Sequence, residues 1–492
     1  MFSKRSLLLL VFFFGILCHG NAQSDTISSN NSSLTYEVEL FGSVATKDFT
    51  PFWFTSNQYG KIPLETNNGY INPAITYHQS LSKDFYWNAV MDVVAVTPRR
   101  RKFYFQQIYA EAGYKSLLLR VGSKEDHKGF VDRYLSSGDM SYSGNARPIP
   151  EINLSLIRYV PFPGTKGWLQ VKGEFAVGRS FDTGYLKSFV ADNQEYVKDM
   201  LWHHKSLHFK INDSRRNGPF SLELGVNHWA QWGGTSSTRG KQPQSFKDFI
   251  RIVLSKSGSG GSTDSDQVNA LGNHCGNYDI KFGYKFPNVS MQLYHQHFFE
   301  DKSGMIFRNG WDGLWGVELT FNKLPQLKKM VFEYVNTRNQ SGPFHNIDFD
   351  HDKYPGHGGG NDNYYNNQDF VSGYSYFNRG LGNPLVLSPE YNKDGKLGFK
   401  CNRIRDFHLG AEGEILANLQ YRLLFTFMEG WGTHDAPFLK KKTSTATMLQ
   451  VSYQHSKLPD WNFIPSVGFD TGDLVKSTGV SLKIVKRGIL KL

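Results

Sequence analysis

Cysteine is scarce in this chain. This excludes small domains held together by cysteine-bound metals and small domains held together by several disulfides. The 492 residues include 3 cysteines, and none pairs with another at the short spacing of a zinc or iron–sulfur site. Cys18 lies in the apolar N-terminal run, which leaves Cys275 and Cys401 in the rest of the chain. These two could form one disulfide in an oxidising compartment or stay free, but they cannot make a disulfide scaffold.

Long apolar runs are missing beyond the N-terminus. The one such run, residues 7–17, follows Lys4 and Arg5, is too short to span a bilayer and is followed by small residues. This pattern predicts a secretory signal peptide over residues 1–22 and a mature chain over 23–492. Because no later run has the length of a transmembrane helix, an exported chain of this kind could enter a membrane only as a closed β-barrel.

Motifs of enzymes and nucleotide-binding sites are also missing. The chain has no Gly-x-Ser-x-Gly elbow, no phosphate-binding loop and no paired-cysteine metal site. His203 and His204 are adjacent, so a strand would point them to opposite faces. Asp348, Asp350 and Asp352 match the start of a calcium loop, but its turn glycine and its last acidic ligand are replaced. The sequence therefore predicts no metal, no cofactor and no catalysis.

Aromatic rings and positive charge are abundant instead. Phe, Tyr and Trp make up 15% of the chain, yet the mean hydropathy is −0.45, which is typical of a barrel with aromatic belts and a wet interior. The formal charge of +11 falls to +9 without Lys4 and Arg5. This surplus, and the cationic run Arg99 to Lys102, indicate anionic partners such as lipopolysaccharide phosphates or an acidic glycan, but not nucleic acid for an exported chain. Solubility during export would explain the surplus equally.

Alternation of apolar and polar residues recurs from about residue 34 to residue 485. Val480, Leu482 and Ile484 alternate with polar or charged residues, and residues 34–40 and 419–427 do the same. A period of two places one set of side chains on each face of a sheet. The apolar set is rich in aromatic residues and the other set holds the charges, which is typical of a barrel with lipid outside and water inside.

The alternating segments predict an all-β fold, a transmembrane antiparallel β-barrel of about 18 strands. The expected strands cover residues 34–44, 70–80, 85–96, 103–113, 117–122, 150–160, 166–178, 204–212, 219–229, 278–286, 289–299, 314–322, 328–337, 405–416, 419–430, 446–456, 461–470 and 477–486. Short and long connections alternate along the chain. We therefore expect the short turns and both termini in the periplasm, and the long loops outside the cell. A soluble propeller or solenoid is the alternative, but no repeat of 40–50 residues shows motif identity.

Two of the long loops show helical spacing of apolar residues, and we expect short helices that pack into the barrel mouth as lids. The first set is Tyr185, Phe189, Tyr196, Val197, Met200 and Leu201. The second is Phe246, Phe249, Ile250, Val253 and Leu254, followed by a flexible Gly/Ser connector over residues 257–262.

Rings stand beside amides and charges in the expected outer segments, a combination suited to sugars. Aromatic plates match the apolar faces of sugars, and planar amide, carboxylate and guanidinium groups match their hydroxyls. Taken singly, each ring is explained as well by an interfacial belt or by pinning of loops. The candidate polysaccharide-binding residues are Trp229, Gln231, Trp232, Trp311, Trp315, Asn367, Gln368, Asp369, Tyr374, Tyr376, Arg379 and Arg403.

An ordered series of segments resembles the Wzi-type capsule-assembly outer-membrane proteins, in particular the branch found in Bacteroides-like bacteria. The series comprises Pro51 to Gly60, Phe103 to Glu111, Leu201 to His208, Gly225 to Gly234, Tyr365 to Asp369 and Gly468 to Leu474. The resemblance implies an eighteen-stranded outer-membrane barrel of a Gram-negative bacterium that acts as a surface lectin, binding capsular polysaccharide and attaching it to the cell without catalysis.

Two departures from that family concern the ends of the chain. Better-known members carry a periplasmic helical bundle, which is expected to be absent here because the first strand starts soon after Ala22. The chain also ends in Ile489 to Leu492 without the terminal aromatic residue that many barrels use. The expected partners are capsular polysaccharide, outer-membrane lipid and lipopolysaccharide, together with other capsule-export components, for a monomeric barrel.

Other functions stay open at this point. The main alternative is a porin or glycan-uptake channel, for which an open lumen would be required. A membrane-embedded hydrolase using Ser372 or Ser375 with His408 has no support from spacing. The sequence leaves open the identity of the glycan, the state of the lumen and the partners at the periplasmic turns.

Overall fold

The computed structural model describes residues 32–98, 103–191, 194–212, 218–258, 270–343 and 360–490. The predicted signal peptide over 1–22, the cationic run 99–102 and the aspartates at 348–352 lie outside these residues, as does most of the Gly/Ser connector. No helix in the described segments is long and apolar enough to cross a membrane.

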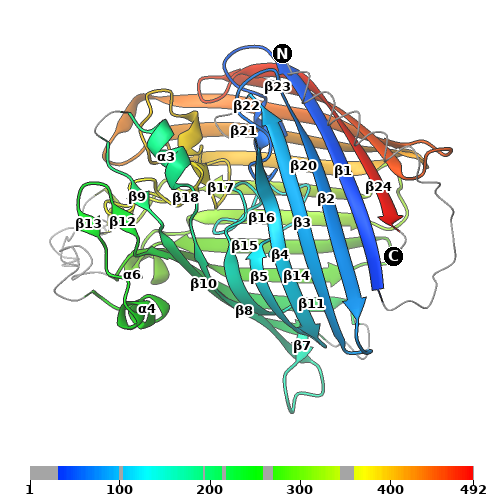
Figure 1. Cartoon of the computed structure of the whole chain (residues 1–492), viewed down its shortest axis with the longest axis horizontal. Coiled ribbons are helices and arrows are strands. Elements are labelled where there is room, and N and C mark those ends of the chain that lie inside the picture. Colours follow the sequence, from blue (N-terminus) through cyan, green and yellow to red (C-terminus); the bar gives the residue numbers. More distant parts are fainter. Residues whose placement is uncertain are drawn as a thin grey trace.

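One closed antiparallel barrel forms the molecule (Figure 1). Its sheet has 19 strands, of which the short β6 and β7 both pair with β8 and share one position, so the wall has eighteen positions. β1 pairs with β24 and closes the ring. The strands are β1 (Ser32–Ala45), β2 (Asn68–Ser80), β3 (Phe85–Thr97), β4 (Phe103–Tyr114), β5 (Leu117–Ser123), β6 (Glu151–Leu156), β7 (Val160–Pro161), β8 (Leu169–Arg179), β10 (Leu201–Asn212), β11 (Phe220–Trp232), β14 (Asn273–Lys285), β15 (Val289–Phe299), β16 (Gly313–Phe321), β17 (Lys329–Asn336), β20 (Arg405–Leu416), β21 (Leu419–Gly432), β22 (Pro437–Gln454), β23 (Trp461–Gly472) and β24 (Ser477–Leu490).

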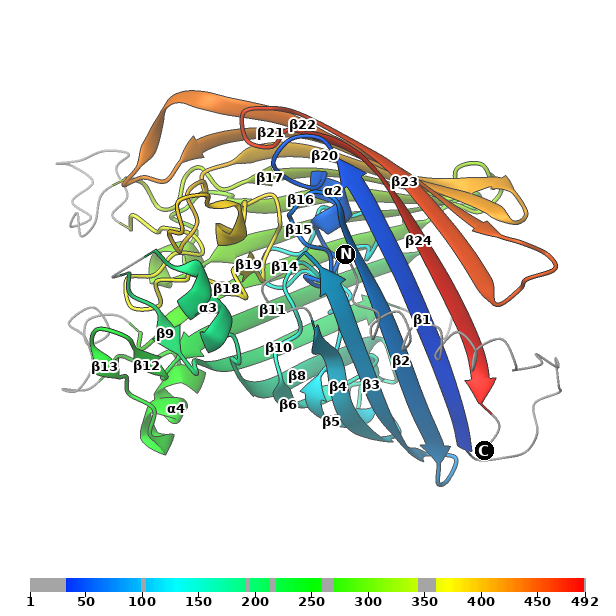
Figure 2. The same cartoon turned by 45° about the horizontal axis from the view of Figure 1, so that its top comes forward.

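This architecture confirms the predicted eighteen-stranded barrel and most of its strand positions. The largest difference is β22, which begins at Pro437 rather than at residue 446 and extends the hairpin with β21 beyond the rest of the wall (Figure 2). Exposed apolar side chains such as Phe425, Val480 and Leu482 face outward, whereas Arg422 and Lys483 line the interior. The alternation in the sequence thus separates lipid-facing from lumen-facing side chains.

Short turns and long loops lie at opposite ends of the barrel. Turns such as 81–84, 115–116, 287–288 and 417–418 gather at one end, together with the start of β1 and the end of β24. The long connections gather at the other end, on the left in Figure 1. We call these the short-turn end and the long-loop end.

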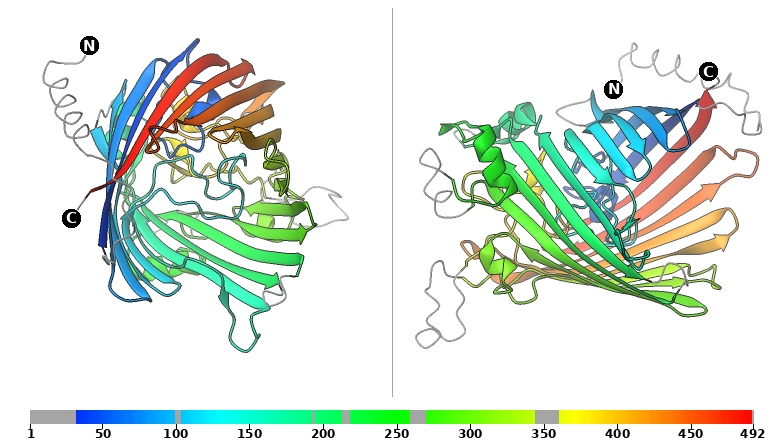
Figure 3. Two further views of the ribbon diagram at one scale, coloured as in Figure 1. Left: turned by 90° about the vertical axis from the view of Figure 1, so that its right-hand side faces the viewer. Right: turned by 90° about the horizontal axis from the view of Figure 1, so that it is seen from below.

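Three long loops fold back into the barrel and fill its long-loop half (Figures 2 and 3). The first plug loop, residues 46–67, carries α2 (Phe52–Thr55). The second covers residues 124–150. The third, described over 360–404, carries the two-residue strands β18 (Ser375–Tyr376) and β19 (Arg379–Gly380) and the 3₁₀ turn η1 (Pro389–Tyr391). Buried side chains of all three loops join those of the wall in one hydrophobic cluster.

The first expected loop helix is shorter than its apolar spacing suggested. Helix α3 covers only Thr183–Phe189 and packs Tyr185 against Phe377 of the third plug loop, as a cover over the mouth. The predicted continuation to Leu201 is wrong. Val197–Lys198 forms the short strand β9, and Leu201 starts β10, because these residues pair with neighbouring strands instead.

The second expected helix exists as α4 (Phe246–Val253), but its predicted place in the mouth is wrong. Ser245 and Asp248 form a capping box at its start. Phe249 packs on Phe175, His203 and Trp232, whose side chains lie on the outer face of the barrel. The helix therefore lies against the outside of the wall, because its inner apolar face matches the apolar outer rim and not the polar lumen.

The free face of α4 is also apolar. Phe246, Ile250 and Leu254 follow at intervals of four residues and form one exposed stripe, with Phe246 78% exposed. Lys247 and Arg251 lie beside this stripe. An amphipathic helix with this layout is suited to the interfacial zone of a membrane.

We predict that residue 246 contacts lipid. A nitroxide attached to Phe246→Cys should be more accessible to oxygen than to a water-soluble nickel complex when the protein is in a bilayer. A nitroxide at Lys247→Cys, one residue away on the polar side, should show the reverse order. Cys275 and Cys401 are free and buried, so labelling should be specific to the new thiol. Equal accessibility of both labels to the nickel complex would contradict the placement.

Candidate functional site

The plug is held to the wall by a chain of hydrogen bonds through polar residues of two strands. The indole Nε1 of Trp53 donates to the Thr426 hydroxyl over 3.1 Å, and that hydroxyl lies 2.8 Å from Nδ1 of His408. Nε2 of His408 donates to the carbonyl of Leu135 over 2.8 Å. Since the carbonyl can only accept, Nε2 carries the proton and Nδ1 accepts from Thr426. The chain links the first and second plug loops, and it occupies both ring nitrogens of His408.

Close approach of the second plug loop to the wall depends on a glycine. A Cβ atom at Gly410 would lie 2.3 Å from the carbonyl oxygen of Leu135. Any side chain there would push the loop away from β20. Nearby, the carboxylate of Glu333 accepts from the Ser136 hydroxyl and the backbone N–H of Ser137, each over 2.6 Å.

Arg379, one of the candidate glycan ligands, is a central pin of the plug. Its Nη1 and Nη2 donate to the carbonyls of Thr55 and Ile62, each over 2.8 Å, and its Nε donates to Glu390 over 2.6 Å. Arg379 is 3% exposed. The guanidinium fork thus ties the third plug loop to the first, and its donors point into protein.

Trp229 also serves the packing between wall and plug. Its ring stacks on His204 of β10, with centroids 3.9 Å apart, and on Tyr142 of the second plug loop, 4.6 Å away. Nε2 of His204 contacts the carboxylate of Glu151 at 2.8 Å. In this three-ring stack Trp229 and His204 are buried and Tyr142 is half-buried.

Three further candidates are buried in the same region. The Tyr374 hydroxyl donates to the carbonyl of Ser141 over 2.8 Å. The Gln231 amide donates to the carbonyl of Gly373 over 3.0 Å and accepts from Asn273 over 2.6 Å. The Tyr376 hydroxyl accepts from the backbone N–H of Phe181 over 3.3 Å.

The other three candidate tryptophans, Trp232, Trp311 and Trp315, lie on the outer face of the barrel. Trp232 packs beneath α4. Trp315 stacks on His295 at 3.8 Å, and Trp311, 64% exposed, lies 5.9 Å from both. Their position is that of an interfacial aromatic belt.

The last four candidates lie at the rim of the long-loop end. Asn367 caps the turn that follows it, since its side-chain oxygen accepts from the backbone N–H groups of Asp369 and Phe370. Asp369 pairs with Arg239. The Gln368 side chain is exposed, and Arg403 is half-buried.

The structure therefore brings Trp229, Gln231, Tyr374, Tyr376 and Arg379 together, but in the buried region where the wall and the plug meet. It places Trp232, Trp311 and Trp315 on the outer wall, and leaves Gln368 and Arg403 within reach of a surface ligand. The role of the twelve residues in polysaccharide binding stays a prediction.

A polar platform at the rim was not identified from the sequence. Strand β9 pairs with β12 (Thr235–Ser236), which pairs with β13 (Gly240–Lys241), and the three form a small sheet beside Gln368. Arg239 forms ion pairs with Glu195, at 2.8 Å, and with Asp369. It also donates a hydrogen bond to the Gln368 carbonyl over 3.3 Å. Lys198 lies 5.7 Å from the half-buried Tyr196 ring. Strands of two residues leave no period in a sequence, which is why this platform was missed.

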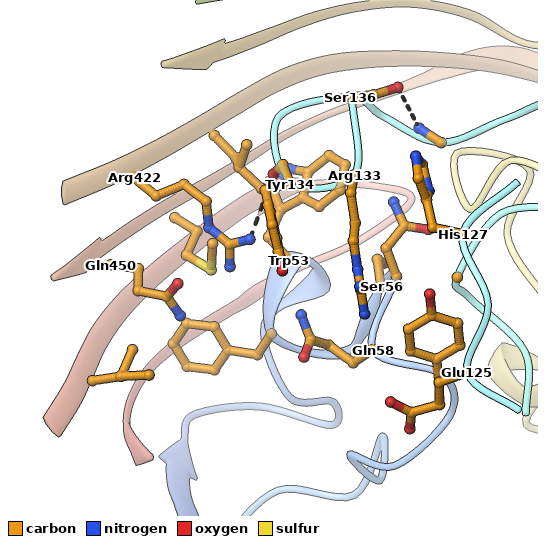
Figure 4. Close-up of a pocket in the computed structure, with 18 of the residues that line it drawn as sticks. Trp53, Ser56, Gln58, Glu125, His127, Arg133, Tyr134, Ser136, Arg422 and Gln450 are labelled. Atoms are coloured by element: carbon orange, nitrogen blue, oxygen red, sulfur yellow. Dashed lines mark hydrogen bonds between the residues drawn. The ribbon is translucent and has the colours of Figure 1, made fainter. Parts of the chain in front are cut away.

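Below the plug, the short-turn half of the lumen holds a polar cavity of about 650 Å³. Figure 4 shows Trp53, Gln58, Arg133, Tyr134 and Arg422 around one space. Arg422 of the wall donates to the Tyr134 carbonyl over 3.5 Å. Rings and amides with free edges are suited to sugar contacts here too.

Charge pairs hold the cavity wall together. Nζ of Lys61 lies 3.4 Å from Glu39 and 3.4 Å from Glu125. Burial alone would lower the pKa of Lys61, but these two carboxylates hold its pKa well above the ordinary value. Burial raises the pKa of Tyr59 to about 12. Burial would likewise raise the pKa of Asp126, but the nearby Lys128 and Arg120 hold it below its usual value.

Across the described segments, no group of three or more His, Cys, Asp or Glu side chains has the geometry of a metal site. The polar side chains described above offer two surfaces for a neutral or charged glycan, namely the rim and the luminal cavity.

Comparison with protein families decides the assignment. The family model described as "Capsule assembly protein Wzi" matches residues 54–386, which is more than half of the chain. The chain belongs to the Wzi family. A comparison with curated protein sequences finds no significant match.

The fold agrees with this membership. The structure of Escherichia coli Wzi, described as a carbohydrate-binding β-barrel of the outer membrane involved in group 1 capsule assembly, aligns with a TM-score of 0.56 at 13% identity. The alignment covers 91% of this chain and 83% of Wzi. This likeness shows the fold alone.

Two other solved structures align less well. Pseudomonas aeruginosa OccK5 (OpdH) gives a TM-score of 0.48 at 8% identity, over 94% of this chain and 99% of its own. Acinetobacter baumannii OccAB3 gives 0.47 at 9% identity, over 94% and 100%. Similarity at this level has no bearing on function.

We predict that Arg379→Met loosens the plug of this Wzi-family barrel but leaves the barrel closed. Two carbonyls and the Glu390 carboxylate lose their donor, and loss of one partner of a buried ion pair costs about 3–5 kcal/mol. Conductance in planar bilayers should rise, and residues 360–404 should become sensitive to protease. Lys393→Met is the control: it removes a cation of the same loop whose ion pair with Asp48 of the first plug loop is solvent-exposed and contributes little, so neither reading should change. Unchanged conductance of the Arg379 variant would show that Arg379 does not hold the plug.

Proposed function

We propose that this Wzi-family chain is an outer-membrane lectin that binds capsular polysaccharide and anchors it at the cell surface during capsule assembly. The observation that supports this best is that three loops of this Wzi-family chain fill the long-loop half of its barrel. A lumen filled in this way favours a binding protein over a conduit. The E. coli relative described as carbohydrate-binding has the same fold.

The proposed orientation places the long-loop end outside the cell. Barrels of the outer membrane have short periplasmic turns and long extracellular loops, and the two ends of this barrel differ in that way. Both ends of the described chain would then face the periplasm, where other capsule-export components could dock on the turns. The barrel would work as a monomer, since β1 and β24 pair with each other and leave no open edge.

The rim is the first place that an external polymer would meet. We propose Tyr196 and Gln368 as direct contacts, with the platform of β9, β12 and β13 around them. The buried candidates Trp229, Gln231, Tyr374 and Arg379 would act indirectly, by holding the loops that present this rim. No catalytic step is proposed, because His408, the base considered for a hydrolase, is hydrogen-bonded on both nitrogens.

A porin or glycan-uptake channel is the second candidate, favoured by the polar cavity in the short-turn half. Against it, a dense cluster that includes Tyr364, Tyr365 and Phe370 lies between this cavity and the long-loop end. A channel function would require the three plug loops to move together.

We predict that Tyr196→Ala/Gln368→Ala weakens binding of capsular polysaccharide prepared from the source cells by about tenfold. Loss of one stacking ring is worth about 1–3 kcal/mol by analogy with base stacking, which corresponds to a factor of this order. Binding of the labelled polymer to the detergent-purified barrel measures the effect, and retention of capsule on cells is the second reading.

Tyr453→Ala/Gln454→Ala is the matched control, since it removes the same residue types at the short-turn end. It should bind polymer like the wild type. If both double variants bind equally well, the rim is not the site, and the luminal cavity becomes the place to probe with Arg133→Ala. If the wild type itself binds no capsular polymer, the proposed function is wrong.

A further inference from the structure

A cluster of cations surrounds Trp431 on the outer face of the wall, at its long-loop end. The charged ends of Arg338, Arg405 and Lys441 lie 5.1, 5.7 and 5.9 Å from the centroid of the Trp431 ring. Arg403 lies beside them, because its backbone carbonyl accepts a hydrogen bond from the backbone N–H of Trp431 over 2.9 Å. Its Nε lies 3.4 Å from the carbonyl of Arg338. We call these four residues and Trp431 the cationic patch.

Positive charge in the patch exceeds the nearby negative charge. Glu429 pairs with both Arg405, at 2.5 Å, and Lys441. In the part of the chain that the structure describes, no carboxylate lies within ion-pair distance of Arg338 or Arg403. Nε of Arg338 donates instead to the Asn336 side chain over 2.8 Å.

Asp312 is a further carboxylate that acts on Arg338 and Arg403. It is buried and already accepts from Asn336 and from the backbone N–H of Gln340. Burial raises its pKa to about 7, so part of its charge is absent at neutral pH. Burial and the neighbouring Arg338 both lower the pKa of Arg403, which indicates that an anion there would be stabilised.

The strand register fixes the height of the patch on the wall. Tyr334 lies opposite Phe407, and Phe407 lies opposite Phe427, so these three rings form one outward-facing row. Two residues closer to the long loops, the next outward row holds Asn336, Arg405 and Glu429. At about 3.3 Å per residue, this row lies about 7 Å from the rings toward the long-loop end. Trp431 and Arg338 lie still closer to that end.

Each height corresponds to a layer of a membrane. Aromatic rings of a barrel lie at the boundary between acyl chains and headgroups. Groups about 7 Å beyond that boundary face the headgroups, where phosphates are the fixed anions. Two arginine forks without a carboxylate partner in the described chain are suited to bidentate contacts with phosphate.

We infer that the cationic patch binds the phosphate groups of a phosphorylated glycolipid in the outer leaflet, with its acyl chains along the aromatic row. The location favours a lipid over the capsular polymer, since the patch is on the wall and is continuous with exposed Phe332 and Phe407 below it. The Trp431 ring offers a plate for a sugar ring of the headgroup. Arg403 also belongs to the rim, but the patch does not include the proposed glycan contacts Tyr196 and Gln368.

The test compares two lipids and four proteins, the wild type and three double variants. Binding of diphosphorylated lipid A and of its enzymatically dephosphorylated form is measured by native mass spectrometry of the detergent-purified full chain. The wild type should prefer the diphosphorylated form. Arg338→Gln/Arg403→Gln should weaken binding of that form by about tenfold or more, because two charge-assisted contacts are lost, and should leave binding of the dephosphorylated form unchanged.

Lys396→Gln/Lys400→Gln removes two exposed cations of the third plug loop and is the matched control. It should bind both lipids like the wild type. Arg338→Lys/Arg403→Lys keeps the charge but loses the forks, and should weaken binding by less than the glutamine variant. Heat-modifiable migration of each variant on gels reports whether the barrel is folded.

Four results would overturn the inference. The first three are equal binding of the two lipids by the wild type, unchanged binding by the folded Arg338→Gln/Arg403→Gln variant, and displacement of the lipid by millimolar inorganic phosphate. Displacement by purified capsular polymer would assign the patch to the polymer and would also overturn it. A failure of polymer binding at the rim leaves this result unaffected.

Discussion

The width of an eighteen-stranded barrel is the constraint on which the rest of the structure depends. Wall side chains can fill an eight-stranded barrel, but a ring of eighteen leaves an interior that something else must occupy or that stays open to water. In this chain the occupant is backbone from three loops. Backbone in an interior needs partners for its N–H and C=O groups, so the wall carries Asp470, Gln231 and Glu333, which accept from or donate to loop backbone.

The sequence predicted the barrel because two-residue periodicity survives wherever a strand has lipid on one side and water on the other. Leu34 to Leu40 and Leu419 to Phe427 show it plainly. Even the alternation of short and long connections could be recognised. The loops have no such period, because each side chain there meets a different neighbour. Gly410 and Arg379 depend on contacts with residues far along the chain, and no local pattern encodes those contacts.

Side chains suited to sugars proved ambiguous for the same reason. Trp229, Tyr374 and Arg379 have the chemistry of a glycan site and also that of a buried polar core, and only their surroundings separate the two. Helix α4 gives the opposite case. Its apolar stripe was visible in the sequence, but a stripe does not say which side of a wall it covers. Phe249 packs against rings on the outer face of the wall, so the predicted place of α4 in the barrel mouth was wrong.

The plug contacts join residues that are very distant in sequence. The N–H of Phe52 donates to Asp470, 418 residues away, and Arg379 binds the carbonyl of Thr55, 324 residues away. Asp470 belongs to the penultimate strand, so its bond to the first plug loop cannot form until nearly the whole chain has been made and inserted. Loop closure over such spans is slow and entropically costly. The interior would consequently stay hydrated throughout insertion, and its filling would mark the end of biogenesis in the bilayer.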